Sequence, residues 1–157
     1  LRRTATSAVA IAEVNDAPVV RVPAAFRVTE DVRGPISWSA IGQPFADDDS
    51  AHLTVTLAVA DGVIDAQAGD GVTIGGSATA RTFAGSPAAL NAYFRSVGRI
   101  GYTTAPDNDA PRVLTTTVSD GRLSTLATSR IQVAAVNDRP RSRPRRPWRG
   151  PGRAGRS

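Results

Sequence analysis

The stretch that decides the fold is residues 113–133, which read VLTTTVSDGRLSTLATSRIQV. It holds two strand-like runs, residues 113–118 and 123–133, on either side of Asp120-Gly121. β-Branched residues favour strands, and Asp-Gly between two such runs is a strong hairpin signal. The stretch therefore predicts an antiparallel pair of strands joined by a tight turn.

The rest of the chain continues this pattern. Leu53, Val55, Leu57 and Val59 alternate with polar or small residues, as in a strand with one buried face. Shorter strands are expected at residues 26–29, 36–38, 63–64 and 72–74. One short helix is predicted from Ser86 as N-cap and Pro87 at the first helical position, followed by Leu90, Phe94 and Val97 at helical spacing. Many short strands with one helix predict an all-β fold, a β-sandwich.

Composition narrows the possible functions. The chain has 157 residues, of which 41% are hydrophobic and 5% aromatic, enough for one domain of ordinary size. The absence of Cys excludes disulfides, thiol catalysis and zinc–thiolate sites. His52 is the single histidine, and its position beside Asp49 suggests either a dyad or a lone surface histidine. No loop supplies a nucleophile, a base and oxyanion donors in recognisable spacing, so we expect no enzyme.

Charge divides the chain into two parts. Residues 1–138 carry 11 Arg against 14 Asp or Glu, whereas residues 139–157 carry 8 Arg and no acid, which together give the net charge of +5. The basic part is rich in Arg, Pro and Gly, with Trp148, and has too few apolar residues to fold, so we expect it to be disordered. Such a tail attracts polyanions by charge alone, without specificity for a nucleic acid sequence. No apolar run approaches the length of a membrane-spanning helix.

A repeat with an offset of 122 residues defines the organisation. Residues 5–18, ATSAVAIAEVNDAP, align with residues 127–140, ATSRIQVAAVNDRP, and both end in Val-Asn-Asp-x-Pro. A period of this length matches a whole domain. We therefore expect residues 1–16 to be the last strand and linker of a preceding unit, residues 17–138 to be one complete unit of a tandem array, and residues 139–157 to be the tail.

Acidic and amide side chains gather where the strands should end. They lie at Glu30-Asp31, at residues 47–49, at residues 107–109 and in the two linkers. Carboxylate and amide oxygens are the ligands that Ca²⁺ prefers, and it takes about 6–8 of them. No single cluster offers that many, so a calcium site would need several loops and a linker. Each cluster could instead be a solvated loop or a simple Asx turn.

The order of these motifs resembles the bacterial cadherin-like repeat of large secreted adhesins. The resemblance is carried by Val-Asn-Asp-Ala-Pro, Thr29-Glu30-Asp31, residues 47–49, residues 90–94 with Tyr102-Thr103, residues 117–121 and the second Val-Asn-Asp-x-Pro. It implies an Ig-like, Greek-key sandwich of seven strands, a secreted or cell-surface location, and calcium held between successive repeats. Adjacent repeats of the same chain would then be the partners in a structural and adhesive module, whose adhesion target would be a surface glycan or another cell-surface protein.

The resemblance also implies two sets of calcium ligands. The upper junction would comprise Glu13, Asn15, Asp16, Asp47, Asp49 and Asp120. The lower junction would comprise Glu30, Asp107, Asp109, Asn137 and Asp138, and its linker has Ala135 where the first has Glu13.

Two alternatives remain open. Trp38 and Tyr102 could be core aromatics, or an exposed pair that stacks on a surface glycan in a carbohydrate-binding module. The Arg-rich tail could make the chain a polyanion-binding fragment.

Overall fold

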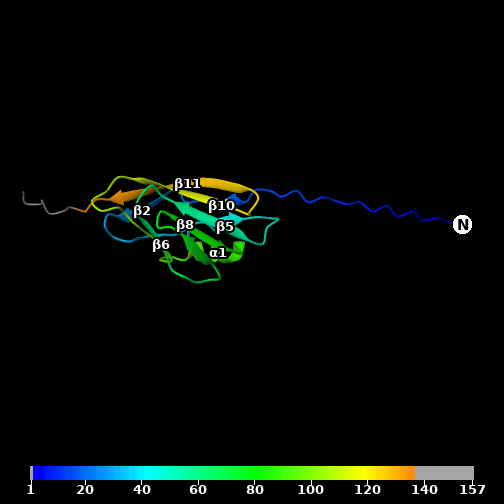
Figure 1. Cartoon of the computed structure of the whole chain (residues 1–157), viewed down its shortest axis with the longest axis horizontal. Helices are drawn as coiled ribbons and strands as arrows, with labels where there is room; N and C mark the ends of the chain where they lie inside the picture. The colour runs from blue at the N-terminus through cyan, green and yellow to red at the C-terminus, as the bar shows by residue number, and fades with distance from the viewer. Residues whose placement is uncertain (1, 137–157) are drawn as a thin grey trace, which may run out of the picture.

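The structure, a computed structural model, describes residues 2–136, which form two packed layers of short strands with one helix (Figure 1). The larger layer is a six-stranded sheet in the order β2-β11-β10-β5-β8-β7. The smaller layer is the three-stranded sheet β3-β9-β6 together with the helix, and β1 and β4 form a separate pair. The described residues thus hold eleven short strands rather than seven, and the predicted all-β sandwich is confirmed.

The elements are β1 Val19–Val20, β2 Ala25–Thr29, β3 Gly34–Ile36, β4 Phe45–Ala46, β5 Leu53–Ala58, β6 Val63–Ala66, β7 Thr73–Gly76, β8 Ala80–Gly85, α1 Pro87–Arg95, β9 Ile100–Thr103, β10 Arg112–Ser119 and β11 Ser124–Ala134.

The predicted hairpin forms two inner strands of the large sheet. β10 and β11 are antiparallel, with Arg112 opposite Ile131 and Ser119 opposite Ser124. β10 also pairs with β5, whose Leu53, Val55 and Leu57 are buried as their alternation predicts. On its other side β11 pairs in parallel with β2.

Aromatic side chains fill the space between the two layers. Phe94 of α1 lies at the centre, with ring centroids 4.8 Å from Trp38, 4.8 Å from Phe45 and 4.9 Å from Phe83. All four rings are completely buried. Edge-to-face packing at these distances adds to the energy of burial, so Phe94 holds the helix against β8 of the large sheet and against β4.

The helix begins as predicted and ends earlier than predicted. Ser86 accepts a hydrogen bond from the Ala89 amide, and Pro87 occupies the first turn. The helix stops at Arg95 because Ser96 adopts an extended conformation. Val97 therefore lies beyond the helix and is 71% exposed, so its assignment to the apolar face was wrong. Within the described residues, no helix is long and apolar enough to cross a membrane.

The two ends of the described chain lie at opposite ends of the domain (Figure 1). The N-terminal segment reaches the domain beside the β10–β11 turn, which we call the turn pole. The chain leaves beyond the C-terminal ends of β2 and β11, which we call the exit pole. Residues 2–18 contain no strand.

Candidate functional site

The turn pole is organised by Asp120. Its Oδ1 accepts hydrogen bonds from the backbone amides of Arg122 at 2.6 Å and Leu123 at 2.7 Å, and Gly121 has a φ of +94°. A positive φ favours glycine, which has no Cβ to clash with the backbone. The turn fixes one carboxylate oxygen of Asp120 and leaves Oδ2 for other partners.

The linker contacts two of the predicted acidic residues directly. The Asn15 side-chain amide donates to Asp120 Oδ2 at 2.7 Å, and the Asp16 backbone amide donates to Asp49 Oδ2 at 2.8 Å. Pro18 follows and is buried, and β1 then pairs with β4. The linker is thus tied to the domain at successive residues.

Asp47 shapes the loop that carries Asp49. Asp47 Oδ1 accepts hydrogen bonds from the backbone amides of Asp49 at 2.9 Å and Ser50 at 2.7 Å. Its second oxygen, Oδ2, is buried and has no hydrogen-bond partner among the described residues. A buried carboxylate oxygen without a partner is costly, and a bound cation or water would remove that cost.

A hollow of about 290 Å³ lies between the linker and the turn pole. It is lined by Glu13, Val14, Asn15, Asp49, Ser50, Asp120 and Arg122. Of the upper-junction residues, this brings Glu13, Asn15, Asp49 and Asp120 to one cavity, whereas Asp16 and Asp47 line a neighbouring hollow of about 240 Å³. In the part of the chain that the structure describes, no three His, Cys, Asp or Glu side chains are grouped closely enough to hold a metal ion.

Two residues of this hollow escaped the sequence analysis. Ser50 follows the acidic run directly, and its hydroxyl donates to the His52 carbonyl at 2.8 Å. Arg122 directly follows Asp120-Gly121. Its position in that turn is the sequence feature from which it could have been predicted as a site residue. Its guanidinium adds a positive charge to a site otherwise made of oxygen ligands.

The electrostatics of the turn pole favour an ionised Asp120. The hydrogen bond from Asn15 is the main reason that the pKa of Asp120 lies below its ordinary value, and the backbone amides of Leu123 and Arg122 lower it further. Hydrogen bonds to a carboxylate stabilise its charged form. Asp120 therefore stays negative well into the acidic range.

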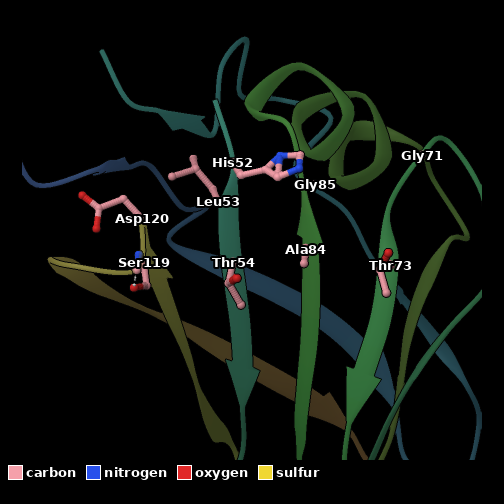
Figure 2. A pocket seen from close by; sticks show the side chains of 10 residues that line it. His52, Leu53, Thr54, Gly71, Thr73, Ala84, Gly85, Ser119 and Asp120 are labelled. Atoms are coloured by element: carbon pink, nitrogen blue, oxygen red, sulfur yellow. Dashed lines mark hydrogen bonds between the residues drawn. The ribbon is translucent and has the colours of Figure 1, made fainter. Parts of the chain in front are cut away.

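A second hollow of about 300 Å³ opens on the outer face of the large sheet and shares Asp120 with the first (Figure 2). Ser119, Thr54, Ala84 and Thr73 form one row across β10, β5, β8 and β7. Figure 2 shows the His52 ring directed toward Gly85, away from Asp120. His52 Nδ1 lies 3.1 Å from the Ala51 carbonyl, and in the part of the chain that the structure describes no hydrogen bond or ion pair joins His52 to Asp49. The structure therefore supports the lone surface histidine rather than a dyad.

The exit pole is built around Glu30. Glu30 is 5% exposed, and Oε1 accepts a hydrogen bond from the Val136 amide, so this side chain is not a surface group. Nearby, the Asp31 amide donates to Thr104 Oγ1 at 3.0 Å.

The other residues predicted for the lower junction are only partly covered by the structure. Asp107 and Asp109 are exposed in the loop between β9 and β10. Asn137, Asp138 and the tail, residues 139–157, lie outside the described residues.

The aromatic pair proposed for glycan binding is not available at the surface. Trp38 and Tyr102 are both completely buried. Trp38 packs on Phe26 at 5.1 Å and on Phe94, and the Tyr102 hydroxyl donates to the Asp61 carbonyl at 3.1 Å. The interpretation of this pair as an exposed stacking platform is therefore wrong.

Comparison with known proteins gives one structural neighbour. No protein-family model and no curated protein matches the chain. Among solved structures, the chain is similar to the N-terminal domain of the Streptococcus gordonii adhesin Sgo0707, with 15% sequence identity and a TM-score of 0.36. The match covers 75% of this chain and 32% of that chain, so this chain spans about a third of its neighbour's length.

Proposed function

We propose that this chain is a non-enzymatic, cadherin-like structural and adhesive module of a secreted or cell-surface protein, and that calcium bound at the turn pole stiffens the linker that enters the domain. The observation that carries the proposal is the contact of Asn15 with Asp120 and of Asp16 with Asp49. These contacts join the linker to two separate loops of the domain. A cation shared by both loops and the linker would fix all three.

The donor types fit a hard cation. The hollow between linker and turn offers carboxylates from Glu13, Asp49 and Asp120, and all are oxygen ligands of the kind that Ca²⁺ prefers. The unpartnered Oδ2 of Asp47 supplies a further buried oxygen in the adjoining loop. Because these carboxylates are not grouped around one point, the linker has to move inward on binding, and Arg122 has to turn outward.

Calcium binding would make the linker stiffer by stabilising its ordered conformation. The ion binds the ordered linker and not the loose one, so it stabilises the ordered state by mass action. Extracellular calcium modules have Kd values of about 10⁻⁴–10⁻³ M. At roughly 10 mM calcium the ion would therefore add about 1.4–2.7 kcal/mol to the free energy of unfolding.

Thermal unfolding of the full chain with and without calcium tests the proposal. We expect calcium to raise the Tm and to slow amide hydrogen exchange at residues 13–17, with Asp49→Asn and Asp120→Asn each abolishing both effects. Asp65→Asn is the matched control. Asp65 pairs with Arg33, away from the turn pole, so this substitution removes the same charge outside the proposed site. Equal calcium responses in all three variants, or none in the unmodified chain, would reject the turn-pole site.

A further inference from the structure

The N-terminal segment carries apolar side chains that nothing in the described chain covers. Val9, Ile11 and Val14 are 82%, 86% and 77% exposed. Residues 8–12 read Ala-Val-Ala-Ile-Ala, so neither face of this segment carries a charge. Such exposed apolar surface in an extended segment marks an interaction surface.

The sequence repeat aligns this segment with strand β11. With the offset of 122 residues, Ser7 aligns with Ser129, Val9 with Ile131 and Ile11 with Val133. These β11 residues all face the interior. Ile131 is completely buried, Val133 packs against the core, and Ser129 is 3% exposed.

Two polar contacts, one in β11 and one just after it, can be compared with the N-terminal segment. The Ser129 hydroxyl donates to the Pro23 carbonyl at 2.6 Å, and Ser7 carries the same hydroxyl. The Val136 amide donates to the buried Glu30 carboxylate, and Val14 occupies the same place in the repeat. The segment thus matches β11 at its core-facing residues and at the Ser129 hydroxyl, which is hydrogen-bonded outside the sheet ladders.

We propose that residues 5–14 are the closing strand of a second sandwich of the same kind, and that they enter between its equivalents of β10 and β2. In this domain β11 pairs antiparallel with β10 and parallel with β2. Val9 would take the place of Ile131, beside the partner's equivalent of Phe26. Both backbone edges of the segment would be paired, and Val9 and Ile11 would be removed from water.

A sandwich of the same kind fits better than an unrelated apolar surface. An apolar groove would require Val9 and Ile11 to be buried, but it would have no need for a hydroxyl at Ser7. The β11 position uses all three, because its equivalents Ile131 and Val133 face the core and Ser129 bonds the Pro23 carbonyl. The inference rests on the repeated-module part of the proposed function and not on its calcium, so every measurement below is made in EDTA.

The first experiment transfers the segment into β11 of the full chain. Substitutions R130A, I131V, Q132A, V133I and A135E make residues 130–135 read as residues 8–13. We expect the Tm to fall by less than about 5 °C, because the core loses one methylene at residue 131 and gains one at residue 133.

A register-shifted variant is the matched control. R130S, I131A, Q132V, V133A and A134I place the same segment one residue out of register, so that alanines face the core. A one-residue slip reverses which side chains are buried, and the Tm should fall by more than about 10 °C. Equal losses of Tm in both variants would overturn the proposal.

The second experiment uses the chain as its own partner. In the register-shifted variant β11 is weakened, so residues 5–14 of one copy should enter the β11 position of the next. Such a contact is heterologous and open-ended, and sedimentation should show oligomers that grow with protein concentration. Adding Val9→Asp and Ile11→Asp should return that variant to monomers. A monomeric register-shifted variant, or oligomers that persist after both substitutions, would overturn the proposal.

Discussion

Thr116 offers the sharpest test of the packing of this domain. It lies in β10 between the buried residues Leu114 and Val118, is completely buried, and its hydroxyl has no hydrogen-bond partner among the described residues. An unsatisfied buried hydroxyl costs about 1–3 kcal/mol. Valine has nearly the same shape without the hydroxyl, and it has a good β propensity. Thr116→Val should therefore raise the free energy of unfolding by about 1–2 kcal/mol.

Urea unfolding and calorimetry can measure this gain. A domain of this size should gain roughly 3–8 °C in Tm, with a higher urea midpoint and an unchanged m-value. Thr117→Val is the control, because Thr117 is the next residue of β10 and faces outward, opposite Thr56. Its effect should stay within about 0.5 kcal/mol. If Thr116→Val were neutral or destabilising, the hydroxyl would have a partner, and the reasoning would fail.

Two further predictions concern polar contacts between segments. Asn91→Ala should lower the free energy of unfolding by about 2–4 kcal/mol in urea, because the Asn91 side chain bonds both the amide and the carbonyl of buried Phe45, at 2.9 Å and 2.8 Å. Asn91→Asp keeps the acceptor but sets a carboxylate oxygen against the Phe45 carbonyl, so at neutral pH it should cost at least as much. The contact of Asn15 with Asp120 should depend on pH: since the pKa of Asp120 is lowered in the folded state, the contact contributes above the unfolded-state pKa and is lost as pH falls through the folded-state value. The Asn15 side-chain amide resonance should report that loss, and in Asp120→Asn it should show no such titration.

The alternation of residue types made much of the large sheet predictable. Leu53, Val55 and Leu57 alternate with polar residues because one face of β5 meets the core and the other meets water. Asp120-Gly121 was predictable because few other dipeptides satisfy that turn. Ser86-Pro87 identified the start of the helix for the same kind of local reason.

Burial set by distant segments was not predictable. Trp38 lies outside any strand and next to two serines, and its burial depends on Phe26 and Phe94 arriving from other elements. Val97 lies at helical spacing from Phe94, but the helix ends before it. The prediction was wrong because spacing alone does not reveal the extended backbone at Ser96.

The candidate site divides in the same way. The family resemblance named Asp49 and Asp120 as candidate ligands, and both line the hollow beside the linker. The contact of Asn91 with Phe45 was missed, since it joins residues 46 positions apart through a side-chain amide with no local pattern. The unpartnered Oδ2 of Asp47 is likewise a property of the folded loop and not of the acidic run.

The strand order also explains why added stiffness would matter at the turn pole. β2 and β11 are neighbours and parallel, with Ala25 opposite Arg130 and Thr29 opposite Ala134. The chain enters near the start of β2 and leaves at the end of β11, so tension along the chain pulls these strands past each other and loads their hydrogen bonds together. Within the described residues, the hydrogen bonds of the linker before Pro18 to the domain are those of Asn15 and Asp16. In a chain under tension the linker would therefore detach from the domain before the hydrogen bonds of the sheet break. A cation bound at the turn pole would strengthen the attachment of the linker.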